Sequence, residues 1–195
     1  MSTLQNPHGA QRTPVFSSQN SHTRWICKTF MVQYPKSVLP PTVCIFCQDD
    51  RELMPAADHE WITPTQVNNM GYRSAWESPE VGVWRMWLEP QIGIDQPSVL
   101  ICTPEGNVLW DPPGWFDREL EEQVRLLGGL SAIASSHPHN VGAHIEWSHT
   151  FGHVPVWVEE ANLAWLTCSD PVIRSWTGQA EIIPGLQLLV CGGHF

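Results

Sequence analysis

Positive charge is scarce in this chain. Its 10 Lys and Arg residues stand against 20 Asp and Glu residues, which gives a formal net charge of -10 at pH 7. Binding to duplex nucleic acid depends on cationic contacts to phosphate, so this imbalance argues against nucleic acid as a partner. The composition instead favours a soluble protein that handles a small-molecule substrate.

Long apolar runs are also missing. No stretch is long enough to cross a bilayer, and residues 1–8 lack the basic segment followed by an apolar one that marks a secretory signal. We therefore expect no membrane association and a cytoplasmic location.

The six cysteines are spread along the chain rather than crowded, which favours thiols or metal ligands over disulfide bridges.

The length of 195 residues accommodates one ordinary domain with an N-terminal appendage. Residues 1–24 are rich in Ser, Gln, Asn, Thr and Pro without a hydrophobic period, which predicts a disordered tail. Residues 25–55 are predicted to form a small cysteine knuckle. A linker is expected over 56–80, and the main domain over 81–195.

The main domain is predicted to be α+β. Strands are expected at 83–88, 98–102 and 108–111, and the turn residues between the last two indicate a hairpin. Residues 117–127 have one apolar stripe, acidic residues in the first turn and two glycines after the last, which together indicate a helix. A strand at 131–136 follows, so this strand, helix and strand should form a crossover between parallel neighbours.

The remainder alternates between helices and strands. We expect Asn140 to cap a helix that runs through Trp147 and Phe151 and ends at Gly152. The later expectations are a strand at 155–158, a short helix at 159–166, a loop at 170–178, and a hairpin of 180–183 with 186–190.

Two histidines follow the predicted strand at 131–136. His137 and His139 are two residues apart in extended chain, so both rings can reach one ion, and Pro138 stiffens their presentation. The last apolar strand runs through two glycines into His194, which supplies a third imidazole. Three imidazoles are a donor set that zinc accepts, so the sequence predicts a zinc site here.

These two motifs resemble the metallo-beta-lactamase superfamily of hydrolases. In that family a His-x-His-x-Asp-His loop binds two metal ions, and a later Gly-His pair gives the third imidazole of the first ion. His137, His139 and His194 match those three ligands. Val141 stands where the family has its aspartate, and Gly142 where it has the second-metal histidine. The resemblance therefore implies one zinc ion at the histidine site.

The resemblance also implies a fold. The family packs two sheets face to face between helices, in a four-layer αββα sandwich. Residues 81–195 resemble its first half, a mixed sheet with flanking helices. The sequence ends at Phe195, before the family's later ligands, so we expect a truncated domain. Its uncovered sheet face should be covered by a second copy in a homodimer or by a partner chain.

Three cysteines form a second candidate metal site. Cys27, Cys44 and Cys47 resemble the rubredoxin-like zinc ribbon of some bacterial members of this family, with Phe30 in the position of the fourth thiol. Two interpretations stay open. In one, a structural zinc ion is held by the three thiolates with His22 or water as the fourth ligand. In the other, the knuckle packs without a metal.

Several polar residues near the histidine loop have two interpretations each. Asp111 could hydrogen-bond a ligand histidine, as the resemblance implies, or cap the loop at 112–115. Glu146 could approach a bound water or lie at the surface. His144 and His149 favour packing or surface roles, because neither falls at the family's spacing.

The predicted function follows from a zinc ion that is bound by three imidazoles and has one coordination position open to water or substrate. Such an ion lowers the pKa of its water to about 7 and polarises a carbonyl. The sequence therefore predicts a zinc hydrolase that acts on an ester, thioester or lactone, slowed by the missing aspartate. Two alternatives stay open: an inactive remnant or binding module of the same fold, and a metal-free scaffold in which all the histidines are structural.

Overall fold

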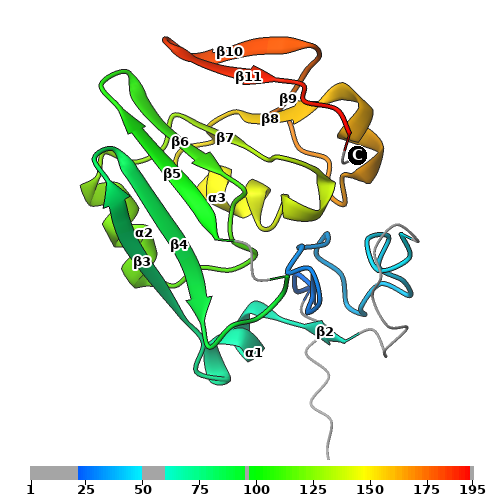
Figure 1. The fold of residues 1–195 in the computed structure, drawn as a ribbon. Coiled ribbons are helices and arrows are strands. Elements are labelled where there is room, and N and C mark those ends of the chain that lie inside the picture. Colours follow the sequence, from blue (N-terminus) through cyan, green and yellow to red (C-terminus); the bar gives the residue numbers. More distant parts are fainter. Residues whose placement is uncertain (1–21, 50–59, 95–96, 194–195) are drawn as a thin grey trace, which may run out of the picture.

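The computed structural model describes residues 22–49, 60–94 and 97–193, and these form an α+β fold (Figure 1). The predicted tail at 1–24 lies outside the described residues except for its last three. His194 also lies outside them. Within the described ranges, every helix is too short or too polar to cross a bilayer.

A seven-stranded mixed sheet forms the centre of the fold. The pairs from β3 to β6 are antiparallel and those from β6 to β9 are parallel, so the carboxyl ends of the last four strands meet at one edge of the sheet. In spatial order the strands are β3 (Arg73–Glu80), β4 (Val83–Glu89), β5 (Ser98–Thr103), β6 (Gly106–Trp110), β7 (Ala132–Ala134), β8 (Val156–Glu159) and β9 (Ile173–Trp176).

The predicted crossover is confirmed. Helix α2 (Arg118–Leu126) connects β6 to β7, and these two strands are parallel neighbours. Asp117 caps the helix, because its Oδ1 accepts a hydrogen bond from the Leu120 backbone at 2.9 Å. Its Oδ2 accepts another from the Ser74 backbone at 2.6 Å, which ties the start of α2 to β3.

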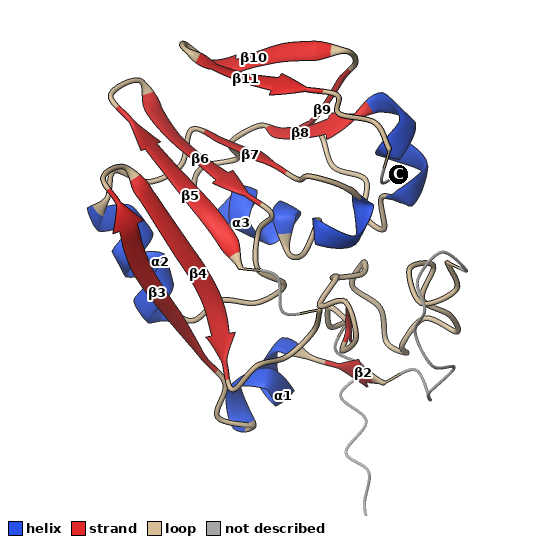
Figure 2. Ribbon diagram, in the orientation of Figure 1, coloured by secondary structure: helices blue, strands red, loops and turns tan. Residues whose placement is uncertain are grey.

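Two helices cover one face of the sheet (Figure 2). Helix α2 and helix α3 (His144–Thr150) pack their apolar residues onto alternate residues of the strands. Trp147 is fully buried there, with ring centroids 4.0 Å from Phe116 and 5.7 Å from Phe151. The residues that fill this core include Met86, Leu100, Leu109, Leu120, Val124, Ile133 and Val156.

A hairpin packs on the opposite face. The strands β10 (Gln179–Ile183) and β11 (Leu186–Leu189) form a separate two-stranded sheet, which confirms the predicted hairpin. Its apolar side chains pack on those of β6 and β7. Beside it an apolar groove of about 280 Å³ is lined by residues of β5, β6 and the hairpin, among them Val99, Ile101, Val108, Ile182 and Leu186.

The N-terminal segment packs against the end of the sheet that carries the histidines. Strand β1 (Ile26–Cys27) pairs with β2 (Trp61–Ile62), and helix α1 (Pro64–Asn69) follows. Val141 belongs to the same apolar cluster as the knuckle residues that follow β1. The N-terminal segment also lies close to the loop after β6. A Cβ at Gly114 would lie 1.7 Å from the Met31 carbonyl oxygen, so only glycine fits at position 114.

Some elements differ from the prediction. The range expected to be a linker, 56–80, contains β2, α1 and the whole of β3, and the loop expected at 170–178 contains β9. β3 and β9 are the two outer strands of the sheet and carry many exposed polar residues. Outer strands tolerate proline, so Pro79 does not prevent pairing. Their composition therefore resembles that of loops.

The prediction that Asn140 caps a helix was wrong. Pro138–Asn140 forms a 3-10 turn, η1, and α3 begins after Ala143 with no side-chain cap. The amide of Asn140 instead donates a hydrogen bond to Asp111 at 3.3 Å. The short helix expected at 159–166 is a 3-10 helix, η2 (Glu160–Trp165).

Candidate functional site

The loop after β7 brings two imidazoles together. His137 has an extended backbone, and Pro138 then starts the 3-10 turn that carries His139. The ring centroids of the two histidines are 5.4 Å apart. Two imidazoles that bind one zinc ion through Zn–N bonds of about 2.1 Å have centroids about 5 Å apart. The pair therefore fits a shared ion.

A hydrogen-bonded chain runs from Asp111 through Ser136 to His137. The Ser136 hydroxyl donates to Asp111 Oδ2 at 2.9 Å, and its oxygen lies 2.9 Å from His137 Nδ1. The Asn140 amide nitrogen lies 3.1 Å from the same Ser136 oxygen and 3.4 Å from His137 Nδ1, so Nδ1 faces this polar network. Nε2 is on the opposite side of the ring, and it is the nitrogen that could bind a metal.

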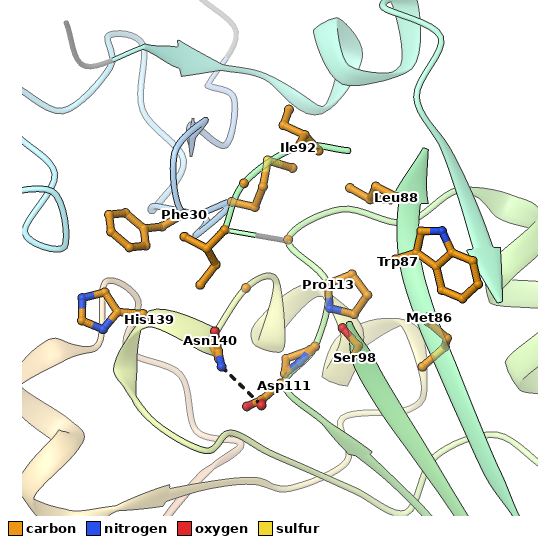
Figure 3. A pocket seen from close by; sticks show the side chains of 16 residues that line it. Phe30, Met86, Trp87, Leu88, Ile92, Ser98, Asp111, Pro113, His139 and Asn140 are labelled. Carbon is orange, nitrogen blue, oxygen red and sulfur yellow. Dashed lines mark hydrogen bonds between the residues drawn. The ribbon is translucent and has the colours of Figure 1, made fainter. Parts of the chain in front are cut away.

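Asp111 holds the whole loop. It lies at the end of β6 with φ of 54°, a left-handed conformation that Asp tolerates better than most residues. Its Oδ1 accepts the Ser136 backbone N–H at 2.6 Å, and Asn140 donates to its Oδ2 (Figure 3). Burial raises the pKa of Asp111 above its usual value, although the hydrogen bonds from Ser136 and Asn140 oppose that shift.

His139 is almost completely buried beneath the N-terminal knuckle. Its ring centroid lies 5.0 Å from that of Phe30 and 5.5 Å from that of Phe46. Trp165 of η2 packs on it from another side, at 6.1 Å. This packing fixes the position of the ring.

Asp49 is a site residue that the sequence did not reveal. Its Oδ2 lies 3.6 Å from His139 Nε2, and both side chains are at most 4% exposed. A carboxylate that faces one nitrogen of a histidine orients the ring and raises its basicity toward a metal on the other nitrogen. The signal available in the sequence was the acidic turn after Cys47, but nothing local indicated that this turn reaches the histidine loop.

The carboxyl edge of the parallel strands forms an open cleft of about 1150 Å³. Strands β6, β8 and β9 each place their last residue in its wall, and the loop after β7 contributes both histidines. Open α/β sheets commonly bind ligands at this edge. The lining residues are Phe30, Ile94, Trp110, Ser135, Ser136, His137, His139, Glu159, Ala161, Asn162, Trp165, Trp176 and 188–192.

The chain that leads to the third predicted ligand lines the same cleft. Residues 188–192 belong to its wall together with His137 and His139. Cys191 and Gly192, which precede the predicted ligand His194, are exposed there.

A close contact excludes a side chain at position 142. The φ of Gly142 is 48°, and a Cβ there would lie 1.9 Å from the Pro112 carbonyl oxygen. Gly142 also lines a small cavity of about 60 Å³ that reaches Asp111 and His139, seen in Figure 3. The histidine that binds a second metal in the resembling family therefore cannot stand here without a backbone shift.

The three knuckle thiols converge. The Sγ atoms of Cys27, Cys44 and Cys47 all lie within 4.8 Å of one another, and those of Cys27 and Cys47 are 3.5 Å apart. Zn–S bonds of about 2.3 Å in a tetrahedron put sulfurs about 3.8 Å apart, so the cluster can hold a metal ion. A hydrogen bond from Cys27 lowers the pKa of Cys44 to about 5, and the same contact raises the pKa of Cys27.

Three other candidates lie away from the cleft. Burial lowers the pKa of His144 to about 4, and its Nδ1 lies 2.9 Å from the Val141 carbonyl oxygen. His149 contacts Asp170 at 2.9 Å through Nε2. Glu146 accepts a hydrogen bond from the Gln33 amide. These contacts account for the three side chains as packing and surface groups.

Comparisons with known proteins give one similar sequence and a weak structural likeness. The chain is 33% identical over 173 residues to the uncharacterized protein YmaE of Bacillus subtilis (strain 168). The match covers 88% of this chain and 63% of that protein, so the chain spans less than two thirds of the relative. No family model matches.

Two solved structures show partial likeness. They are a metallo-beta-lactamase from Cronobacter sakazakii with a HARLDQ motif and a mutant of that motif. Each is 22% identical to this chain, and each match covers 47% of this chain and 36% of the solved chain. The TM-scores are 0.35 for the first and 0.36 for the mutant. TM-scores of this size do not establish a shared fold.

Proposed function

We propose that the protein is a metallo-hydrolase with a metallo-beta-lactamase-like fold. In this proposal one zinc ion, held by His137, His139 and His194, serves the hydrolysis of an ester, thioester or lactone-type small molecule. The observation that carries the proposal is the pair of imidazoles 5.4 Å apart, each facing a carboxylate or a carboxylate-bound hydroxyl, at the wall of a cleft of about 1150 Å³.

The chain's own residues have separate roles around this centre. Asp111, through Ser136, holds His137 with Nε2 as the metal-binding nitrogen. Asp49 faces Nε2 of His139, so we assign Nδ1 of that ring to the metal. Zinc bound to three neutral imidazoles supplies a Lewis acid and a water whose pKa falls to about 7.

The site lacks a carboxylate at the position of the family's water-orienting aspartate. Val141 occupies that position, and its side chain is buried in the knuckle's apolar cluster. Loss of a positioned general base lowers a rate by about 10² to 10⁴-fold. We therefore propose a slow hydrolase.

The test of this function is zinc-dependent hydrolysis. Purified protein should hydrolyse chromogenic aryl esters or lactones slowly, lose the activity on dialysis against a chelator, and regain it when zinc is restored. A protein that binds zinc and hydrolyses none of these substrates would favour the inactive remnant or binding module instead.

Replacing Asp111 with asparagine should lower kcat/KM for such an ester by about 10 to 100-fold. Asparagine keeps the size of the side chain but replaces one acceptor oxygen with an amide donor. One of the two hydrogen bonds from Ser136 is then lost, and the chain of contacts that positions His137 is weakened. The matched control is Asp170→Asn, because Asp170 pairs with His149 outside the cleft. Equal activity in both variants would show that Asp111 does not position His137 for the reaction.

A second, structural zinc ion at Cys27, Cys44 and Cys47 is part of the proposal. The Cys44→Ser variant should then bind about one zinc ion per chain where the parent binds about two, and should unfold at a lower temperature. Cys102→Ser, in β5, is the control and should retain both ions. Zinc content by elemental analysis measures the difference, and about one zinc ion in all three proteins would favour the metal-free knuckle.

A further inference from the structure

The cleft that contains the histidines has aromatic walls. Trp110 and Trp176 come from the ends of β6 and β9, and Trp165 from η2. Phe30 adds a ring from the knuckle. Indole rings bury large flat ligands well and favour offset or edge contacts with aromatic groups. The walls are therefore suited to a flat ring near the metal-binding residues.

One carboxylate stands among these rings. Glu159 ends β8 and is the register partner of Trp176 on β9. Its Oε2 accepts the Ala161 backbone N–H at 2.7 Å, so the side chain is anchored as the cap of η2. The described residues that line the cleft include no lysine or arginine.

The lysines and arginines of the described residues lie outside the lining of the cleft. Arg24 and Lys36 line a separate cavity with His149, and Arg174 donates to the carbonyl oxygens of Pro171 and Ile173. The others form ion pairs with acidic residues away from the cleft: Lys28 with Glu60, Arg73 with Glu89, Arg85 with Glu77, Arg118 with Glu122, and Arg125 with Glu121.

We propose that the substrate carries an uncharged or cationic aromatic group and no carboxylate. This inference rests on the proposed function for the identity of the site. In the proposed function the reacting carbonyl takes the zinc ion, so a carboxylate elsewhere on the ligand would lie among the indole rings. There it would lose water, meet no lysine or arginine of the described lining, and be repelled by Glu159. A cationic ring would gain from the indole faces and from Glu159. Carboxylate-bearing lactams are therefore poor substrates.

The test uses three esters that differ only in charge. They are 4-(trimethylammonio)phenyl acetate, its uncharged isostere 4-tert-butylphenyl acetate, and 4-carboxyphenyl acetate, each rate being divided by that of hydroxide alone. The cationic and neutral esters should exceed the anionic one in kcat/KM by about ten-fold or more. A rate for the anionic ester equal to that of the neutral one would overturn the inference.

A binding measurement separates this inference from the hydrolase proposal. The three matching acetanilides, which resist hydrolysis, are titrated against the same protein by saturation-transfer NMR. Binding in the expected order without ester hydrolysis would support the ligand class and contradict the hydrolase. Equal binding of all three acetanilides would contradict the ligand class whether or not the esters react.

Two variants locate the effect. Glu159→Gln keeps an oxygen that can accept from Ala161 but removes the charge, so the preference for the cationic over the neutral acetanilide should fall by about five-fold. The control Glu160→Gln lies outside the cleft lining and should leave the preference unchanged. Trp176→Leu should weaken all three ligands and keep their order. Equal effects of both glutamate variants would place the selectivity elsewhere.

Discussion

Replacing His137 with alanine should remove zinc from the histidine site and lower kcat/KM for an aryl ester by at least about 100-fold. Changes to residues that only orient a ligand histidine cost 10 to 100-fold, and loss of the ligand itself should cost at least as much. His137 is half-buried in the wall of the cleft, outside the helix-covered core, so the fold should survive the change.

The comparison for this variant is His149→Ala, because His149 is exposed and pairs with Asp170 away from the cleft. Zinc content, ester hydrolysis and circular dichroism are measured on both proteins. Zinc-dependent hydrolysis that persists in His137→Ala at the parent rate would show that the reaction occurs elsewhere.

Replacing Gly142 with alanine should destabilise the protein by about 3 kcal/mol or more. Two effects add: the left-handed φ of 48° is unfavourable for alanine, and its Cβ would meet the Pro112 carbonyl oxygen at 1.9 Å. Backbone must move at one end of the histidine loop to relieve the clash. The free energy of unfolding from urea titrations measures the loss.

A matched control isolates the clash from the backbone strain. Gly152 also has a positive φ, of 89°, but nothing lies within 4 Å of a Cβ built there. Gly152→Ala should therefore cost only about 1 kcal/mol. Equal losses in the two variants would mean that the loop at 142 can relax.

The same contact limits which side chains position 142 can carry. A histidine at position 142 has the same Cβ as alanine, so it meets the same carbonyl oxygen. Changing Val141 to aspartate and Gly142 to histidine, as in the resembling family, should therefore not create a second metal site. The backbone of this loop, which brings the Pro112 carbonyl oxygen against position 142, leaves room only for glycine there.

The sequence predicted the elements that local signals determine. Helix α2 has its own apolar stripe, its Asp117 cap and a glycine stop, and all of these act within a few residues. The outer strands β3 and β9 lack such signals, because each has a strand on one side only and exposes polar residues. Their existence depends on pairing with residues elsewhere in the chain.

The candidate site was predictable only in part, for a similar reason. His137 and His139 are two residues apart in sequence, so their spacing alone indicated a shared ion. Asp49 reaches His139 only because the knuckle folds over the loop, and that packing depends on contacts between distant segments. Phe30 shows the same limit: it stands where a ribbon has a thiol, and its ring packs on His139.

The claim that His194 joins the neighbouring His137 and His139 on one zinc ion is tested most directly by anomalous scattering at the zinc edge from crystals of the whole chain. We expect a peak about 2.1 Å from Nε2 of His137, Nδ1 of His139 and one ring nitrogen of His194. A fully zinc-loaded crystal with no peak between His137 and His139, or with the ring of His194 directed away from it, would contradict the account.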